Sequence, residues 1–472
     1  MERLPSPWGG ARGPDGRRLP SSNLRSPLIK TSKPTFARGV HPSEHKELAA
    51  ETPIEVLPIP PRVTIPLLQH LGAICLAKVK PREEVELGEM IAEATAPVSA
   101  PIHASISGKC ERMTNVTLPN GRHVPAVPIA AAEHQPLAGP GALEEIFGGH
   151  WPLGELTSYE PDAIRAAARD AGLVGLGGAA FPTHIKLARN EKKPIDTLLL
   201  NGCECEPYLT ADDRLMREYP APIVAGAVLA GQAVGARRVL IAVEDNKPAA
   251  LRTMREAAAE ADVDLVELKT KYPQGGEKQL IGAAVGREVP TGGLPLDVGV
   301  VVMNVSTAAA LARAVLRGGP LTHRVVSVTG GGIRRPGNLL VPIGTPYQTL
   351  IDHCGGLRDE AVRVVAGGPM MGFSLGSLEV PVTKGTSGVT VLSRHELRPA
   401  EVTPCVRCGR CVEVCPMRLV PTKLALATRA DNPELARRYH IAACIECGCC
   451  AYICPARLPL VQLIRVGKVM AK

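Results

Sequence analysis

Two cysteine runs near the end of the chain constrain its fold more than any other feature. The run Cys405-x2-Cys408-x2-Cys411-x3-Cys415-Pro416 is repeated in spacing by Cys444-x2-Cys447-x2-Cys450-x3-Cys454-Pro455. This spacing holds cubane iron–sulfur clusters, and in two-cluster proteins the fourth cysteine of each run binds the other cluster. We expect cluster one on Cys405, Cys408, Cys411 and Cys454, and cluster two on Cys444, Cys447, Cys450 and Cys415. Structural zinc sites lack the third cysteine and the proline of each run.

Clusters need thiolates and a reducing compartment, so the cysteine content predicts a cytoplasmic protein. Fourteen cysteines are present, and eight of them belong to the two runs. The longest apolar stretch, about 223–236, is interrupted by glycines and is too short to span a bilayer, which favours a buried helix. No N-terminal signal-peptide core is apparent. We therefore expect no transmembrane segment, and any membrane attachment must come through a partner.

The formal net charge of +8 is not spread over one broad basic face, so we expect no nucleic-acid partner. Residues 1–34 carry a local charge of +5 in a Pro-, Gly- and Ser-rich stretch, which predicts a disordered basic tail over 1–35. Residues 401–472 hold eleven Lys and Arg against five Asp and Glu. That excess either compensates anionic clusters or forms a docking surface for an acidic redox partner.

The pattern of apolar, Pro and Gly residues between the N-terminal tail and the cysteine runs predicts a multidomain protein that combines α/β and β modules. Short strands punctuated by Pro and Gly over 36–130 predict a small closed β module. Apolar runs of strand length at 196–200, 238–243 and 298–302, with Ala-rich helical segments after the last two, predict a largely parallel α/β domain over 150–318. Residues 320–395 are β-like again, with one short helix at 349–354. The cluster domain, 400–465, is predicted to be helical between its cysteine runs.

The densest glycine cluster lies in the α/β domain, over 172–183, and includes Gly175, Gly177 and Gly178. Glycines let main-chain amides approach a phosphate closely, and Pro182 would start a helix whose N-terminus favours an anion. Lys186, one turn into that helix, would add a point charge. From the glycines alone, a tight structural turn is the better explanation. The spacing departs from the G-x-G-x-x-G fingerprint, so a Rossmann site is not expected.

The full string resembles the flavin-binding loop of the NADH-oxidising subunit of respiratory complex I, "G-L-x-G-x-G-G-A-x-F-P-T-x-x-K". Three further segments resemble that family: 201–207 its "N-x-x-E-x-E-P", 272–277 its "Y-x-x-G-E-E", and 304–307 its "N-N-V-E-T". The resemblance implies an FMN site formed by Gly175, Gly177, Gly178, Lys186, Asn201, Glu277, Asn304 and Thr307. It also places Phe181, Glu204 and Glu206 on the nicotinamide side, as catalytic residues.

Several positions depart from the family pattern. Cys203, Gly276 and Met303 replace an acidic residue, a Glu and an Asn, which bears on NADH contacts more than on flavin binding. The lesser alternative for Glu204 and Glu206 is that they are plain surface carboxylates. Cys203 and Cys205 form a C-x-C motif that has either a redox or metal-binding role or a packing role. Cys449 is not expected to be a cluster ligand, because Cys450 and not Cys449 reproduces the spacing of the first cysteine run.

The first β module resembles the barrel-sandwich domains of biotinyl and lipoyl carriers, but its hairpin turn, 93–97, lacks the carrier lysine. We therefore expect this module to serve in docking or packing and not to carry a prosthetic group. Residues 320–395 resemble a soluble-ligand-binding β-grasp module. The order of barrel-sandwich, flavin, β-grasp and two-cluster ferredoxin domains resembles the C subunits of Rnf complexes, the membrane-bound ferredoxin:NAD⁺ oxidoreductases. The opening "G-x-H-P-x-x-x-K-x-L", residues 39–48, strengthens that match.

This second resemblance implies an oxidoreductase subunit that passes electrons between NAD(H), FMN and two [4Fe-4S] clusters. FMN takes a hydride and releases single electrons, which is the chemistry that joins nicotinamide to cubanes. The implied partners are NAD(H), other subunits of the membrane complex, and ferredoxin or an iron–sulfur subunit. The implied location is peripheral, on the cytoplasmic side of the bacterial inner membrane, with ion translocation coupled to the transfer. The competing functions are a non-catalytic iron–sulfur adaptor without flavin and a cobalamin reductase.

Overall fold

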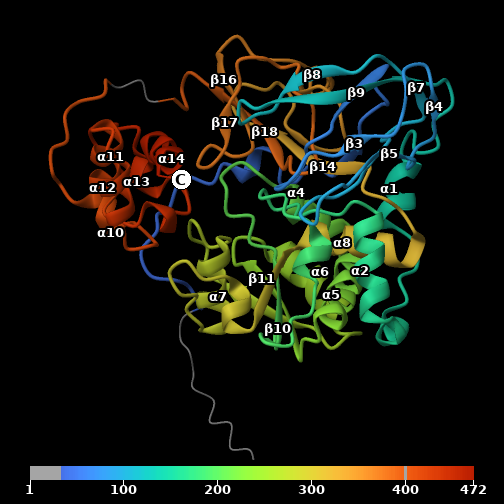
Figure 1. Cartoon of the computed structure of the whole chain (residues 1–472), viewed down its shortest axis with the longest axis horizontal. Coiled ribbons are helices and arrows are strands. Elements are labelled where there is room, and N and C mark those ends of the chain that lie inside the picture. The colour runs from blue at the N-terminus through green and yellow to red at the C-terminus, as the bar shows by residue number, and fades with distance from the viewer. Residues whose placement is uncertain (1–32, 398–400, 472) are drawn as a thin grey trace, which may run out of the picture. The chain divides into compact units, whose positions relative to one another are not determined.

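A computed structural model describes residues 33–397 and 401–471 (Figure 1). The predicted tail therefore lies almost entirely outside the described residues. Contacts group Pro34–Lys472 into one unit. Two residues assigned to the tail are anchored, since the Lys269 amide donates to the Pro34 carbonyl at 3.0 Å and the Thr35 hydroxyl to Gln274 Oε1 at 3.0 Å. In the part of the chain that is described, no helix is long and apolar enough to cross a bilayer.

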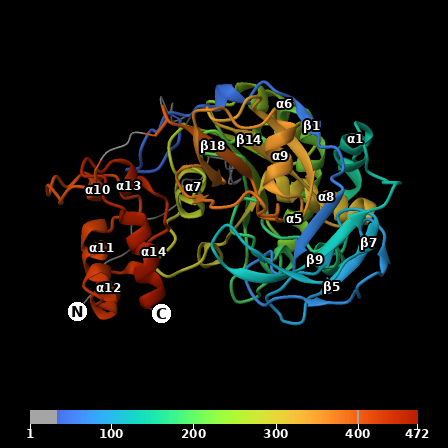
Figure 2. The same ribbon diagram turned by 90° about the horizontal axis from the view of Figure 1, so that it is seen from above.

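The N-terminal β module is built from two small antiparallel sheets. The first has the order β2 (Arg62–Pro66), β9 (His123–Ala131), β7 (Gly108–Cys110) and β4 (Glu84–Val85), with β8 (Thr114–Thr117) on β9. The second consists of β3 (Leu76–Ala77), β5 (Met90–Glu93) and β6 (Ile102–His103). Aliphatic side chains from both sheets, such as Ile65, Ile91 and Ile129, form one core. Figure 2 shows β5, β7 and β9 gathered together.

A four-stranded parallel sheet forms the centre of the α/β module. Its order is β12 (Asp264–Leu268), β11 (Arg238–Glu244), β10 (Thr197–Asn201) and β13 (Val300–Asn304). The predicted strands 196–200, 238–243 and 298–302 are thereby confirmed to within two residues, as is their parallel pairing. The strands are apolar on both sides because helices cover both faces of the sheet.

The helices of this module lie in two layers. Helices α5 (Pro220–Val234), α6 (Pro248–Ala258) and α8 (Val305–Arg317) share a core with Leu198 and Leu200 of β10, and α7 (Glu277–Val285) shares another with Leu199 on the opposite face. Figure 1 shows α7 apart from α5 and α8. Around them are α1 (Gly141–Phe147), α2 (Pro161–Asp170), α3 (Thr183–Lys186) and α4 (Ala211–Glu218). The stretch 223–236 is thus a buried helix, as predicted: Gly226 lies against the Ala308 carbonyl, where a Cβ would be 1.8 Å away.

The third module is a six-stranded mixed sheet that takes one strand from far away in the sequence. Its order is β1 (Ile54–Val56), β15 (Gly337–Pro342), β14 (His323–Thr329), β18 (Gly388–Ser393), β16 (Ala361–Ala366) and β17 (Phe373–Ser374), with α9 (Tyr347–His353) packed on it. Strand β1 lies within the segment predicted to belong to the first β module, yet it pairs in parallel with β15. Sequence patterning could not assign a three-residue strand to a sheet formed almost 300 residues later.

The C-terminal module is helical, as predicted. It contains α10 (Arg410–Glu413), α11 (Pro421–Arg429), α12 (Pro433–Arg438), α13 (Cys449–Tyr452) and α14 (Leu460–Met470). Helices α10 and α13 occupy equivalent positions in the two cysteine runs, each following a glycine with positive φ: Gly409 at 78° and Gly448 at 83°. The repeat in sequence is therefore also a repeat in local structure.

Candidate functional site

The carboxyl ends of β10 and β13 bring the predicted flavin residues together. Asn201 ends β10, Asn304 ends β13, and the two are directly paired in the parallel register. The chain leaves β10 toward β11 and β12 and then returns to the other side of β10 as β13. Ligands of open α/β sheets bind outside the carboxyl ends of the strands at such a point, where the strand order reverses.

The glycine loop lies over this edge of the sheet. It is closed at its base, where the Gly175 amide donates to the Phe181 carbonyl at 2.8 Å. It is tied to α8, because the Leu176 amide donates to the Thr307 hydroxyl at 2.9 Å. A Cβ on Gly177 would lie 3.2 Å from Cβ of Asn304, so the loop runs close to the end of β13.

The loop presents main-chain donors to open space. Gly177 and Gly178 are exposed, and Gly178 has φ of +115°, a conformation that favours glycine, with nothing within 4 Å of the point that a Cβ would occupy. The amides of Gly177, Gly178 and Ala179, all described, have no hydrogen-bond partner in the structure. Free amides at a glycine turn form an anion-binding concavity. The residues present therefore fit the phosphate group of FMN.

The predicted helix after Pro182 is only the four-residue α3, so its N-terminus contributes little to anion binding. Lys186, on α3, does not present a free charge to the loop. Its ammonium donates to Glu277 Oε1 at 3.0 Å and to the Val302 carbonyl at 2.8 Å. Two predicted cofactor residues are thus brought together, but as an ion pair that partly neutralises the lysine.

Segment 272–277 contacts segment 201–207 through a hydrogen bond in which Asn201 Nδ2 donates to the Gly275 carbonyl at 2.8 Å. Asn304 caps α8, accepting from the Thr307 amide at 3.3 Å, while its Nδ2 donates to Asp212 at 2.6 Å. Asp212 also accepts from the Ser306 hydroxyl at 2.5 Å. Sequence reasoning missed Asp212; the only sequence signal is its place in the acidic first turn of α4.

Glu204 does not point freely into solvent. Its two carboxylate oxygens accept from the amides of Asp212 at 2.8 Å and Asp213 at 3.1 Å, at the start of α4. Burial raises the pKa of Glu204 to about 7, against the lowering effect of the nearby Lys46 ammonium. The residue has φ of +45°, in the left-handed region. It is thus held on the loop that follows β10.

Glu206 lies between modules. Its oxygens accept from the Met370 amide at 3.1 Å and the Met371 amide at 2.9 Å, in the mixed-sheet module, and the Tyr272 hydroxyl lies 3.4 Å away. Burial raises the pKa of Glu206 to about 7. The expectation of plain surface carboxylates therefore does not describe the geometry of Glu204 or Glu206, since both accept main-chain N–H groups.

Lys46 braces the loop that carries both carboxylates. Its ammonium donates to the carbonyls of Glu204 at 2.9 Å, Glu206 at 3.1 Å and Leu209 at 2.5 Å. An ammonium has three N–H donors, and these three carbonyls use all of them. Lys46 belongs to the opening motif at 39–48, and this contact across some 160 residues is a role that sequence patterning did not reveal.

The thiols next to this loop are embedded in protein. Cys203 is fully buried, and the Cys205 sulfur accepts from the Gly275 amide at 3.3 Å. Burial raises the pKa of both thiols. Among the described residues, no three His, Cys, Asp or Glu side chains are placed to share a single metal ion. The geometry of this C-x-C favours the packing role.

The cysteines of cluster two surround one cavity. A pocket of about 360 Å³ in the C-terminal module is lined by Cys415, Cys444, Cys447, Cys449 and Cys450. Burial raises the pKa of the Cys450 thiol, and the neighbouring Cys447, Cys444 and Cys415 raise it further. The four expected ligands are thus mutual neighbours, with Cys415 contributed by the first run. Four sulfurs around a cavity fit a cubane, in which each thiolate binds its own iron.

The cysteines of cluster one are grouped in the complementary way. Burial raises the pKa of the Cys411 thiol, and beyond a backbone hydrogen bond the charges acting on it come from Cys454, Cys408 and Cys405. Cys405 and Cys408 are exposed, whereas Cys411 is buried. The exposed Val402 and Val406 flank this end of the module. The structure thus brings Cys454 of the second run close to Cys411 of the first, together with Cys405 and Cys408.

The segments that carry cluster-two ligands contact the α/β and mixed-sheet modules. The Tyr272 hydroxyl donates to the Cys447 carbonyl at 2.7 Å, and a Cβ on Gly448 would lie 2.5 Å from the Met370 carbonyl oxygen. The N-terminal arm, which we define as residues 34–40, adds the Gly39 amide donating to the Val414 carbonyl at 3.0 Å. Cluster two therefore lies on the side of its module that faces the predicted flavin site.

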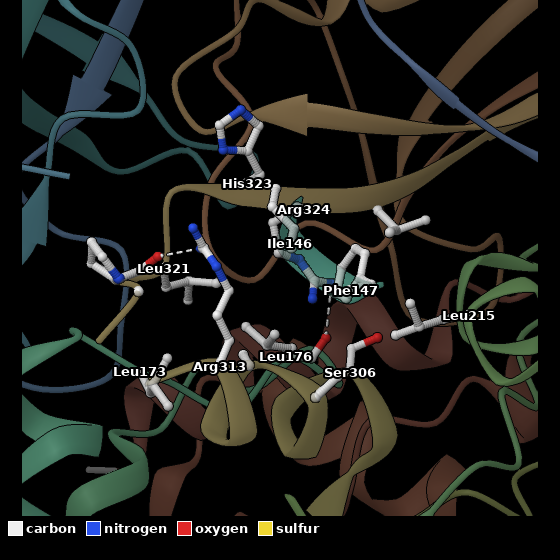
Figure 3. A pocket seen from close by; sticks show the side chains of 15 residues that line it. Ile146, Phe147, Leu173, Leu176, Leu215, Ser306, Arg313, Leu321, His323 and Arg324 are labelled. Carbon is white, nitrogen blue, oxygen red and sulfur yellow. Dashed lines mark hydrogen bonds between the residues drawn. The ribbon is translucent and has the colours of Figure 1, made fainter. Parts of the chain in front are cut away.

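A separate pocket of about 460 Å³ lies behind the glycine loop (Figure 3). Leu176, Ser306, Arg313 and Arg324 contribute to its lining, and Arg324 donates to the Leu176 carbonyl at 3.1 Å. None of the residues predicted to bind FMN or nicotinamide lines this pocket, although all of them are described. Ser306, Arg313 and Arg324 are hydrogen-bonded to the protein, whereas Nε2 of His323, which also lines the pocket, has no partner among the described residues.

Comparison with known families assigns a description to each part of the chain. Residues 34–134 match a family described as the RnfC barrel sandwich hybrid domain, and residues 168–313 match the Nuo51 FMN-binding domain. Residues 325–374 match the SLBB domain, and residues 404–458 match a 4Fe-4S dicluster domain. A mixed α/β protein with β, flavin-type and cluster modules is thereby confirmed.

Curated relatives match across most of the chain. The C subunit of the proton-translocating ferredoxin:NAD⁺ oxidoreductase complex of Clostridium ljungdahlii is 42% identical, covering 84% of this chain and 85% of the relative. The C subunit of the Na⁺-translocating complex of Acetobacterium woodii is 43% identical, covering 83% and 86%. The C subunit of the ion-translocating oxidoreductase complex of Rhodobacter capsulatus is 42% identical, covering 96% and 85%.

Among solved structures, an NAD⁺-reducing [NiFe]-hydrogenase in the air-oxidised state aligns with a TM-score of 0.48 at 23% identity, over 66% of this chain and 58% of that one. The family assignment depends on the sequence relatives and not on this alignment. With identities above 40% over more than four fifths of each of those relatives, the chain belongs to the family of C subunits of ion-translocating ferredoxin:NAD⁺ oxidoreductase (Rnf) complexes.

Proposed function

We propose that this protein is the NAD(H)-handling flavo-iron–sulfur subunit of a membrane-bound Rnf-type complex. In this role it passes electrons between NAD(H), FMN and two [4Fe-4S] clusters, and the complex couples the transfer to ion translocation. The observation that carries the proposal is the row of unpartnered amides at 177–179 over the paired strand ends Asn201 and Asn304. Successive free amides in a glycine turn form a concavity suited to an anionic group, which is what the phosphate of FMN supplies.

In the proposed site, the amides at 177–179 hold the FMN phosphate, while Gly175 allows the close approach of the loop. Asn201, Asn304 and Thr307 line the strand ends, and Lys186 with Glu277 forms the neighbouring polar wall. Phe181 is the stacking wall on the nicotinamide side, and Glu204 and Glu206 border that side from the loop after β10. FMN, when bound, supplies the exchange between two-electron hydride transfer and one-electron transfer.

The proposed modules follow the predicted boundaries: a barrel-sandwich domain at 36–130, an FMN/NADH domain at 150–318, a β-grasp domain at 320–395 and a two-cluster ferredoxin domain at 400–465. Strand β1 is the exception, because Ile54–Val56 completes the proposed β-grasp sheet. The protein is proposed to lie peripherally on the cytoplasmic side of the bacterial inner membrane, where NAD(H) is available.

The two clusters are proposed to have different neighbours. Cluster two faces the flavin through Tyr272 and Met370, whereas the exposed Cys405 and Cys408 place cluster one at the end open to a partner. That partner is ferredoxin or an iron–sulfur subunit of the complex. Of the two explanations for the basic excess over 401–472, this arrangement favours the docking surface.

Anaerobic purification tests the proposal, with FMN, iron and sulfide measured on the same sample. We expect one FMN and eight irons per chain, and bleaching of both chromophores by NADH. Protein that carries the clusters but no flavin would support the adaptor function instead. Reduction of a corrinoid by NADH, without association with membrane subunits, would support the cobalamin reductase.

A further inference from the structure

The segment Tyr272–Gly275 connects the ligands of cluster two to the predicted flavin site. At one end, the Tyr272 hydroxyl donates to the main-chain carbonyl of the cluster ligand Cys447 at 2.7 Å. At the other end, the Gly275 carbonyl accepts from Asn201 at 2.8 Å, at the end of β10. Four residues therefore span the distance between the two sites.

The main chain of Tyr272 is fixed independently of its hydroxyl. Its carbonyl accepts from the Val40 amide at 2.9 Å, and its amide donates to the Val40 carbonyl at 3.0 Å. The side chain is 2% exposed. Removing the hydroxyl alone would therefore leave the ring and the chain in place.

The single hydroxyl proton is directed toward the cluster. Two acceptors lie near it, Cys447 O at 2.7 Å and Glu206 Oε1 at 3.4 Å. Both carboxylate oxygens of Glu206 already accept hydrogen bonds, from the Met370 and Met371 amides. The shorter contact has hydrogen-bond geometry, whereas the longer one is at the limit.

We propose that Tyr272 is a positioning residue for electron transfer, whose hydroxyl holds the Cys447 segment against the α/β module and raises the reduction potential of cluster two. The positive end of the O–H dipole points toward the cluster side and favours its more negative, reduced state. Hydrogen bonds and burial around the ligands are the means by which proteins set cluster potentials. The inference deepens the proposed function, because it takes cluster two as the neighbour of the flavin.

The test is Tyr272→Phe in the full-length protein, purified anaerobically with its cofactors. Reductive titration followed by electron paramagnetic resonance gives the potential of each cluster, and Cys405→Ser identifies the signal of cluster one. We expect the cluster-two potential to fall enough to change its reduction equilibrium about two- to tenfold, the range that one hydrogen bond supports. Cluster one, FMN content and iron content stay unchanged.

Tyr347→Phe is the matched control. Tyr347 is 1% exposed and its hydroxyl contacts the Thr386 hydroxyl at 3.4 Å in the mixed-sheet module, so the same chemical change there should move neither cluster. Equal potentials for cluster two in the wild type and Tyr272→Phe would overturn the inference. A shift of both clusters together would overturn it as well.

A second variant keeps the test decisive if Tyr272→Phe loses its clusters. Glu206→Gln removes the charge that competes for the hydroxyl proton, so the cluster-two potential should rise while that of cluster one stays constant. No rise would overturn the inference. These results are separate from the proposed function, which fails only if wild-type protein lacks FMN or does not react with NADH.

Discussion

Replacing Lys46 by Met should loosen the loop that carries Glu204 and Glu206. Met keeps the length of the side chain but donates no hydrogen bond, so the carbonyls of Glu204, Glu206 and Leu209 lose their shared donor. Each unsatisfied buried carbonyl costs about 1–3 kcal/mol, while removing a poorly solvated ammonium recovers several kcal/mol. That desolvation is real here, because burial lowers the pKa of Lys46.

The net cost is about 3 kcal/mol, concentrated on the loop after β10. Two residues there have left-handed backbone conformations, Glu204 at φ 45° and Tyr208 at φ 71°, and these persist only while surrounding contacts enforce them. A local opening made about 3 kcal/mol easier speeds amide exchange about 100-fold.

Hydrogen–deuterium exchange of peptides covering 202–210 measures this directly. The Tyr208 amide, which donates to the Glu44 carbonyl at 2.7 Å, should lose most of its protection. In the holoprotein, KM for NADH should rise about tenfold while dithionite still reduces both clusters. Lys384→Met is the control, because Lys384 is also a buried lysine and donates to the Pro101 and Gly172 carbonyls at 2.7 Å, away from this loop.

Exchange at 202–210 within twofold of the wild type, together with an unchanged KM, would refute the bracing role of Lys46. Faster exchange in Lys384→Met at the same peptides would refute its specificity. A change in Lys46→Met that spread evenly over the whole chain would show that the lysine stabilises the fold in general and not this loop.

Three further predictions test other parts of the site. Gly178→Ala should lower FMN occupancy about tenfold, since φ of +115° disfavours a side chain, whereas Gly121→Ala, with φ of +82° and equally open surroundings, should not. Burial raises the pKa of Glu206 to about 7, so the folded state binds the proton more tightly and loses about 1 kcal/mol of stability from pH 6 to pH 8. Glu206→Gln should remove that loss, measured as the thermal midpoint at both pH values; an identical pH dependence would contradict the assignment. Cys415→Ser should change the magnetic signal of cluster two and not that of cluster one, and the reverse result would disprove the crossed ligation.

Local sequence signals predict the elements of this protein well. Helix α2 begins at Pro161, in the first-turn position that proline favours, and the strands ending at Asn201 and Asn304 are apolar runs bounded by polar residues. The glycine loop and the cysteine runs were readable because their chemistry requires residues at fixed short spacings. These signals are contained within about 15 residues of sequence.

The contacts that complete the site are not local, and they escaped sequence reasoning. Lys186 pairs with Glu277, 91 residues away, and Lys46 reaches carbonyls about 160 residues away. Nothing near Glu206 in the sequence indicates that it accepts amides from Met370 and Met371. Such pairings depend on how whole modules pack, which no periodicity encodes.

The N-terminal arm has a consequence for biosynthesis. Arg38 donates to the Val412 carbonyl at 2.9 Å, across 374 positions of sequence, so the arm can make this contact only after the C-terminal module has been synthesised. Until then, the arm cannot pack against the C-terminal module next to the cysteines expected to bind cluster two. The contact of the arm with the segment before Cys415 is therefore among the last contacts that the growing chain can form.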